Sequence, residues 1–193
     1  MLVALWIALA LLTSGGCAVA SWSHPARIAG LTSSDARALA RTLRALPEEE
    51  RLAELGRRSA AGSWERRFAH ALLDAAGDRA RIAAANDLLA EAEHRLEVGA
   101  GWPRAGVRLS AFGALLLAML AFLSGAGASA LVVIAGVGGA GALASALAGR
   151  AGRVEAERQR GAIDGLVAAA VGPLASITAA PVPARRGRGG ARA

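Results

Sequence analysis

The chain has 193 residues, of which 54% are hydrophobic, and its 22 basic residues are all Arg, against 15 acidic residues. Soluble domains average about 45–50% apolar residues, so this composition excludes an ordinary soluble domain. The charge is also segregated, because residues 1–25 and residues 109–149 contain no Asp, Glu, Lys or Arg. Such segregation is typical of an integral membrane protein.

The uncharged segments are long enough to cross a bilayer as helices. A bilayer core of about 30 Å needs about 20 apolar helical residues. The longer uncharged block has 41 residues, enough for two crossings, and SGAGAS in its middle is the best place for a turn. We therefore predict an all-α integral membrane protein with three transmembrane helices. One span covers residues 1–23, and a hairpin covers residues 107–149, with helices near 107–124 and 129–149.

The first segment admits other interpretations. LVALWIALALLTSGGCAVASW has no positive residue before it, whereas a cleaved signal peptide begins with positive charge. A lipoprotein signal would acylate Cys17, but Ser14 stands where such signals prefer Leu. An uncleaved helix is therefore favoured over either kind of processing. Cys17 is the only cysteine, so no intrachain disulfide can form.

The Arg residues that flank the spans predict the orientation, because Arg and Lys near membrane helices stay on the cytoplasmic side. Every flanking Arg falls on one side if the N-terminus is outside and both residues 24–106 and the tail are inside. Trp102 is added to these residues, because Trp is enriched at the headgroup level of a membrane. The predicted membrane-interface residues are Arg27, Trp102, Arg104, Arg108, Arg150 and Arg153.

Residues 24–106 predict a cytoplasmic helical domain, because they are rich in the strong helix formers Ala, Leu, Arg and Glu. Thr32, with Asp35 three residues later, predicts a capped first helix that ends near Leu46. Pro47 then opens a second helix. Its three consecutive Glu residues suit the positive end of a helix dipole.

Two more helices are predicted in the same domain. Ser63 can cap the third, and Gly77 separates it from a fourth over about residues 78–98. The fourth has a short coiled-coil-like seam, which we expect to pack on the other short helices or on a neighbouring subunit. The seam residues are Ile82, Ala85, Leu89, Ala92 and Leu96.

Few residues suggest chemistry. Glu91-x-x-His94 has the spacing of carboxylate-bridged di-iron sites, but such sites need two copies of the motif and the chain has one. His70 and Asp74 lie one turn apart and are most simply a surface pair. We predict no catalytic residue, no metal site, no cofactor and no enzymatic activity, because no nucleophile–base arrangement can be argued from this sequence.

The C-terminal part divides in two. Residues 150–172 continue the third span as a cytoplasmic amphipathic helix. Residues 173–193 consist largely of Ala, Pro, Gly and Arg, a composition that predicts a disordered basic tail. On the cytoplasmic face its arginines most simply attract anionic lipid, and nucleic acid is not expected as a partner. These arginines are Arg185, Arg186, Arg188 and Arg192.

The stretch LVVIAGVGGAG at residues 131–141 has the G-x-G-x-x-G spacing of a dinucleotide-binding turn. Such a site also needs a second strand after the glycines. That strand ends in an acidic residue about 20 positions beyond the glycines. GRAGRV, before Glu155, forms no apolar strand. We instead predict a helix whose small-xxx-small face meets a second copy or a partner. The predicted helix-packing residues are Gly138, Gly141, Ser145 and Gly149.

The order of these segments resembles the MotA/TolQ/ExbB proton-channel family. The local sequence is also similar over about residues 90–170, in EHRLEVGAGWPRAGVRLSAFGALLLAMLAFL before and through the second span, and in ALASALAGRAGRVEAERQRGAIDGLVAA at the end of the third. The resemblance implies a multi-pass protein of the bacterial inner (plasma) membrane. It also implies a homo-oligomer that couples to, or scaffolds, a single-span membrane protein.

One departure bears on transport. Proton-conducting members of that family have polar residues in the second and third spans, notably threonines, whereas residues 109–149 offer only four serines. Proton conduction by this chain is therefore in doubt, and no functional residue of the family can be carried over to a position here. The alternative is a membrane adaptor unrelated to that family, whose cytoplasmic helices bind a protein partner. A membrane-anchored enzyme or lipoprotein is a third possibility, for which the sequence shows no site.

Overall fold

The computed structural model describes residues 2–33 and 35–172, and every regular element in those ranges is a helix. Three helical segments are long and apolar enough to cross a membrane, Leu2–Ile28, Asp78–Leu123 and Ala128–Val171. The predicted all-α class with three such helices is therefore confirmed. The predicted disordered tail, 173–193, lies outside the described residues. The helices are α1 (Leu2–Ile28), α2 (Ala36–Arg44), α3 (Glu48–Arg58), α4 (Trp64–Asp74), α5 (Asp78–Glu97), α6 (Trp102–Leu123) and α7 (Ala128–Val171).

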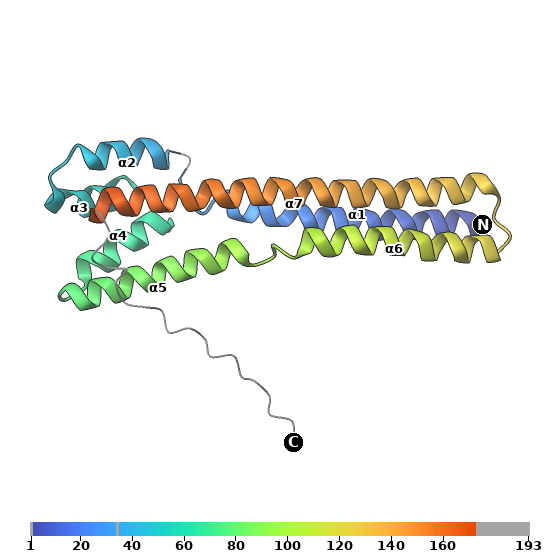
Figure 1. Ribbon diagram of the computed structural model, residues 1–193, viewed down its shortest axis with the longest axis horizontal. Coiled ribbons are helices and arrows are strands. Elements are labelled where there is room, and N and C mark those ends of the chain that lie inside the picture. Colours follow the sequence, from blue (N-terminus) through green and yellow to red (C-terminus); the bar gives the residue numbers. More distant parts are fainter. Residues whose placement is uncertain (1, 34, 173–193) are drawn as a thin grey trace, which may run out of the picture.

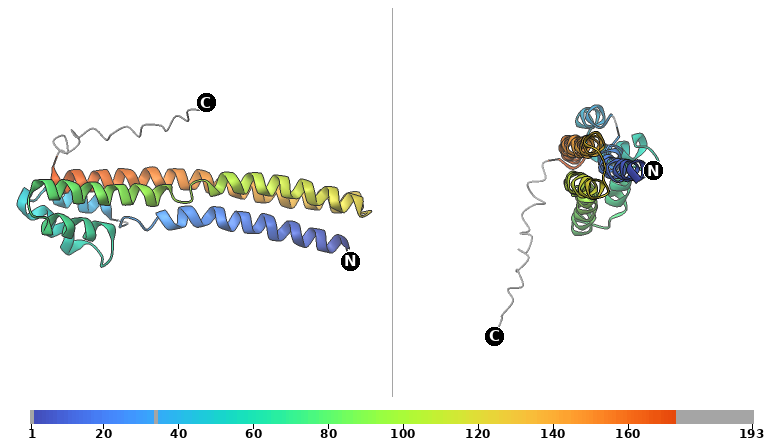
Figure 2. Two further views of the ribbon diagram at one scale, coloured as in Figure 1. Left: turned by 90° about the horizontal axis from the view of Figure 1, so that it is seen from below. Right: turned by 90° about the vertical axis from the view of Figure 1, so that its right-hand side faces the viewer.

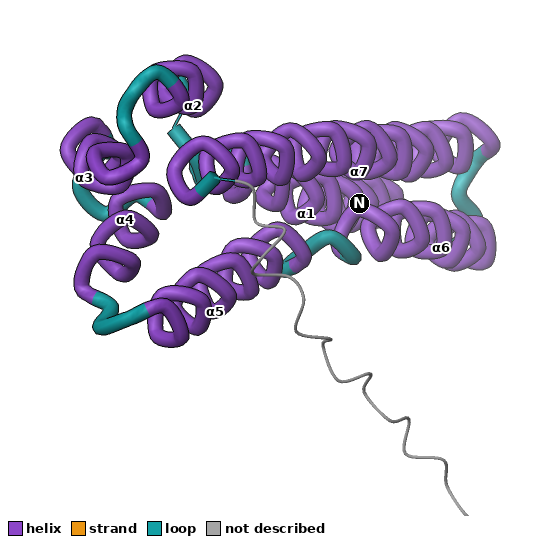
Figure 3. The backbone as a smooth tube through the Cα atoms, turned by 60° about the vertical axis from the view of Figure 1, so that its left-hand side comes forward, coloured by secondary structure: helices purple, strands orange, loops and turns teal. Residues whose placement is uncertain are grey.

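The long helices form an elongated three-helix bundle. α1, α6 and α7 contact one another and run side by side along the long axis of the molecule (Figures 1 and 2). At one end of this bundle, α6 turns into α7 through residues 124–127, where Gly125 adopts a φ of 79° that glycine allows (Figure 3). Apolar side chains around Ala10, Ala121 and Ile134 fill this end. The N-terminus of α1 lies at the same end (Figure 1).

The short helices α2–α5 gather at the opposite end, around the second half of α7 (Figures 1 and 2). We call α2–α5 together with that half of α7 the helical domain. Its core is a single apolar cluster to which all five helices contribute. Trp64 and Phe68 stack in it, with ring centroids 5.0 Å apart. The largest fully buried apolar side chains of this cluster are Leu43, Leu55, Trp64, Phe68, Leu166 and Val167.

Local signals explain most helix ends. Ser63 caps α4 by accepting a hydrogen bond from the backbone N–H of Arg66, as predicted. Three Glu residues occupy the first turn of α3 directly after Pro47. The predicted cap at Thr32 is wrong, because α2 begins at Ala36 after Asp35, without a side-chain cap. Thr32 instead donates hydrogen bonds to a side chain of α7, as described below.

α7 is one uninterrupted helix of 44 residues, so its apolar half and its charged half belong to the same continuous helix. α1 continues to Ile28, and α6 already begins at Trp102. Both helices therefore extend beyond the spans of 1–23 and 107–124 that hydropathy indicates. The reason is that backbone hydrogen bonding continues a helix after the side chains have become polar.

The seam predicted on α5 faces the core of the helical domain. Ala85, Ala92 and Leu96 are buried there, and Leu89 packs against the same cluster. The indole N–H of Trp64 in α4 donates to the carbonyl of Leu88, over 3.1 Å. The apolar seam of α5 therefore packs within the chain, against the other helices of the helical domain.

Candidate functional site: the small-residue seam and the junction

The small-residue face of α7 lies in the centre of the bundle. A Cβ built on Gly141 would come within 2.6 Å of the Cβ of Ser14 in α1, and one on Gly138 would collide with Ala114 of α6. Ser145 is fully buried. A glycine is therefore required at both positions for three backbones to approach this closely.

These contacts correct one expectation. The predicted face was expected to meet a second copy or a partner, but α1 and α6 of the same chain already cover it. Gly149, its fourth member, lies against Pro103, where an added Cβ would be 2.9 Å away. Gly136, the first glycine of the G-x-G-x-x-G string, points elsewhere and has open space around it. The string is a helix-packing motif inside one chain.

We call the contact of α1 and α6 with the small-residue face of α7 the small-residue seam. Serines from all three helices line it. Ser14 comes from α1, Ser110 from α6 and Ser145 from α7, and each is at most 3% exposed. Their hydroxyl groups lie without a hydrogen-bond partner within the described residues. Ser21 is also buried, and its hydroxyl donates to the carbonyl of Cys17 over 2.7 Å. The interior of the bundle is therefore mildly polar, whereas its outer surface is apolar.

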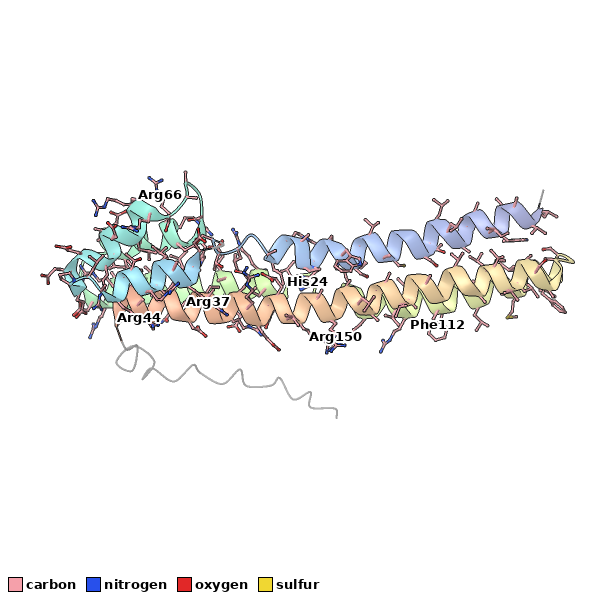
Figure 4. The ribbon with its side chains drawn as sticks, turned by 90° about the horizontal axis from the view of Figure 1, so that it is seen from above. His24, Arg37, Arg44, Arg66, Phe112 and Arg150 are labelled. Carbon is pink, nitrogen blue, oxygen red and sulfur yellow. The ribbon has the colours of Figure 1, made fainter. Side chains whose placement is uncertain are left out.

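A junction forms where the bundle meets the helical domain, with His24 at its centre. His24 is 3% exposed, and its Nδ1 lies 3.1 Å from the carbonyl oxygen of Val98, just after α5. A Cβ on Gly152 of α7 would come within 3.0 Å of the His24 ring. His24 therefore links the end of α1, the α5–α6 connection and α7, as its position in Figure 4 shows.

The predicted interface residues collect around this junction. Arg27 and Trp102 both lie against Gly99, and Arg27 donates to the carbonyl of Ser23 over 3.1 Å. Arg153 donates to the carbonyl of Gly149 over 3.3 Å. Arg150 points away from the bundle (Figure 4). The remaining two lie on α6, Arg104 next to Pro103 of the junction and Arg108 one turn further into the bundle, and both are exposed.

The connection between α1 and α2 is fixed by buried polar side chains that the sequence did not reveal. Gln159 of α7 donates to the carbonyl of Ala29 and accepts from the backbone N–H of Thr32, each over 3.1 Å. The Thr32 hydroxyl donates to the same amide oxygen over 2.5 Å. Glu65 of α4 accepts from the backbone N–H of Ser33 over 2.6 Å.

Sequence signals for these residues are weak but present. Gln159 is the only glutamine of the chain, and it lies in residues 150–160, where every other polar side chain is Arg or Glu. Ser14, Ser21 and His24 follow spacings of seven and three, which place them on one face of a helix. No comparable pattern marks Glu65, because its burial depends on how α4 docks.

Two carboxylates of the helical domain are held by arginines. The guanidinium of Arg58 hydrogen-bonds Glu54 and holds its pKa below the ordinary value, with Arg57 adding to the effect. The Arg67 guanidinium does the same to the pKa of Glu91, which also pairs with Arg95 over 2.7 Å. Glu91, part of the Glu-x-x-His pattern, therefore pairs with arginines of α4 and α5.

Comparisons with protein-family models, with curated proteins and with solved structures find no match for this chain. The architecture alone defines its class. It is an all-helical protein with three helices apolar enough to span a membrane, of which the third continues into a helical domain at one end. That arrangement is compatible with a multi-pass membrane protein.

Proposed function

We propose that this protein is a scaffold subunit of a bacterial inner membrane complex, similar in plan to the MotA/TolQ/ExbB proteins. The apolar bundle spans the membrane, and the helical domain lies in the cytoplasm. The observation that carries the proposal is α7, which packs against α1 and α6 in one half and against α2 and α3 in the other. A rigid helix of this kind transmits a movement or a load between the membrane and the domain.

The distribution of charge supports this orientation. The Arg residues of the junction lie on the side of the helical domain, whereas the 124–127 turn carries no charge. Under the positive-inside rule, the helical domain then faces the cytoplasm and the N-terminus faces outside. Trp102 is 52% exposed at the junction, a position that suits an indole at the headgroup level.

The position of the serines favours a scaffold over a proton conductor. Ser110 and Ser145 point into the bundle of their own chain, and Ser124 and Ser129 lie at the turn between α6 and α7. Beyond Arg108, which lies near the junction, the outward face of α6 therefore offers only apolar side chains from Leu109 to Leu123. A pore between subunits that this face lined would have no polar group to carry a proton. The most exposed of these side chains are Leu109, Phe112, Leu115, Leu116, Met119, Phe122 and Leu123.

We propose that the scaffold is a homo-oligomer, and the outward face of α6 is the surface to test. Phe112 is 70% exposed and points away from the bundle (Figure 4), and Gly113 beside it has open space. In a Cys17→Ala background, Phe112→Cys is expected to give cross-linked dimers in native membranes with a short bis-maleimide. Ala114→Cys, buried against Gly138 on the same helix, is the matched control and stays monomeric. Monomer from both variants would contradict the oligomer.

Two further measurements distinguish the scaffold from a proton channel and from an adaptor for a cytoplasmic protein. Vesicles containing the purified protein and a pH-sensitive dye are expected to lose a proton gradient no faster than empty vesicles. Faster loss would show that the chain itself conducts protons.

Purification from native membranes is expected to retain a single-span membrane protein. If a soluble protein is retained instead, the chain is an adaptor for a cytoplasmic partner.

A further inference from the structure

An open groove of about 690 Å³ lies at the end of the helical domain where α7 terminates. Figure 1 shows this end of α7 beside α3 and α4. α3, α4, α5 and the last turn of α7 line it. Its apolar walls are incompletely covered, since Leu73 is 45% exposed. The apolar lining residues are Leu52, Leu72, Leu73, Ile82, Ala85, Ala170 and Val171.

The rim of the groove is acidic. Glu48 and Glu49, at the start of α3, and Asp78, at the start of α5, contribute three carboxylates, and Arg81 contributes the only cation among the lining residues. The rim thus carries a net charge of about −2. All four of these side chains are exposed. An occupant that is apolar at one end and basic at the other suits this surface.

The chain itself supplies such a segment at the mouth of the groove. α7 ends at Val171, a lining residue, and Gly172 has a φ of 81° that turns the backbone out of the helix. The following segment, 173–193, reads PLASITAAPVPARRGRGGARA. It starts with Leu174 and Ile177 and ends with four Arg, and it contains no acidic residue.

We propose that residues 173–193 bind in the groove of their own chain. Leu174 and Ile177 cover the apolar walls, and the arginines that follow reach the carboxylates on the rim. Because the segment is tethered directly at the groove, its effective concentration there is of millimolar order, so weak contacts suffice. The tail then covers the apolar walls of this groove.

Binding of the same arginines to anionic lipid is the competing possibility. The groove lies 22 residues beyond Gly149 along α7, which is about 33 Å from the junction at 1.5 Å per residue. The point at which the tail leaves α7, at Gly172, is therefore far from the membrane surface but adjacent to the groove. This geometry favours the groove, and the experiment distinguishes the two.

The test measures the reactivity of a cysteine at Leu73 in the full-length chain, in a Cys17→Ala background. Leu73→Cys is expected to react with N-ethylmaleimide about tenfold more slowly than the same protein that also carries Leu174→Asp and Ile177→Asp, if the tethered segment binds with a dissociation constant of about 0.1 mM. Glu48→Arg with Glu49→Arg is expected to accelerate the reaction as well. Val154→Cys, at a 61% exposed position elsewhere on α7, is the control and keeps one rate throughout.

Three outcomes would overturn the proposal. Equal rates for Leu73→Cys with and without the tail substitutions would show that the tail does not cover the groove. Protection that appears only when anionic vesicles are added would assign the tail to lipid. Protection that increases with protein concentration would place the tail in the groove of another copy.

Discussion

At the scale of single residues, the facing direction of each glycine decides what it does. Gly138 and Gly141 point into the seam of the bundle, where a Cβ has no space. Gly136 and Gly139, on the same helix and in the same string, have nothing within 4 Å of a built Cβ. The side of α7 on which a glycine lies therefore decides whether a Cβ at that position would have space.

Gly138→Val is expected to destabilise the bundle, because its side chain would overlap Ala114. Overpacking of this kind costs about 1–3 kcal/mol. Gly139→Val introduces the same β-branched residue into the same helix at an open position, so it reports the cost of helix propensity alone. Thermal unfolding in detergent measures both. Equal midpoints for the two variants would show that the seam tolerates a side chain.

The arginine-held carboxylates predict an acid sensitivity of the helical domain. The pKa values of Glu54 and Glu91 are both lower in the folded protein than the ordinary 4.5. Their stabilising effect is therefore present above about pH 4.5 and is lost as the pH falls through the lower folded values. The unfolding midpoint is expected to fall upon acidification, and to fall less in Glu54→Gln with Glu91→Gln. A double variant with the wild-type pH profile would exclude these two groups as the cause.

At the scale of elements, α7 organises the molecule and Gln159 fixes the chain to it. The amide side chain of Gln159 is 4% exposed and satisfies the backbone of the α1–α2 connection at Ala29 and Thr32. The connection therefore runs against α7 along a defined path. This contact couples the end of α1 to the same helix that carries the domain.

Gln159→Leu is expected to loosen that connection. The substitution removes the partners of buried backbone groups, at a cost of about 1–3 kcal/mol. Backbone N–H groups of residues 29–33 are expected to exchange with deuterium faster than in the wild-type protein. Glu157→Leu, at an exposed position two residues away, is the control and is expected to leave exchange there unchanged. Unchanged exchange in Gln159→Leu would mean that the connection is held by other contacts.

The sequence predicts the elements better than their contacts. Runs of uncharged residues indicate the three long helices, and punctuation at Pro47, Ser63 and Gly77 locates three of the short ones. These signals act within one or two helical turns. Thr32 is mispredicted as a cap because its hydroxyl binds Gln159, which lies 127 residues away. Which side of α7 meets α1 and α6 likewise depends on tertiary packing, so the sequence does not show that the small-residue face packs within its own chain and not against a second copy or a partner.

At the scale of the whole molecule, polarity separates along the long axis. Apolar side chains cover the outside of the bundle, the Arg and Trp residues gather at the junction, and the ion pairs lie in the helical domain. The bundle has a mildly polar interior and an apolar exterior, which is the arrangement that a lipid environment stabilises. Under the proposed function, the junction marks one surface of the membrane.

The central claim is that the bundle spans the inner membrane with the helical domain inside. Single cysteines at Ala126, Ala60 and Arg160 in a Cys17→Ala background test it directly, with an impermeant maleimide on intact cells and after permeabilisation. Residue 126 is expected to react in intact cells, whereas residues 60 and 160 react only after permeabilisation. Reaction of residue 60 in intact cells would contradict the orientation, and with it the proposed cytoplasmic scaffold.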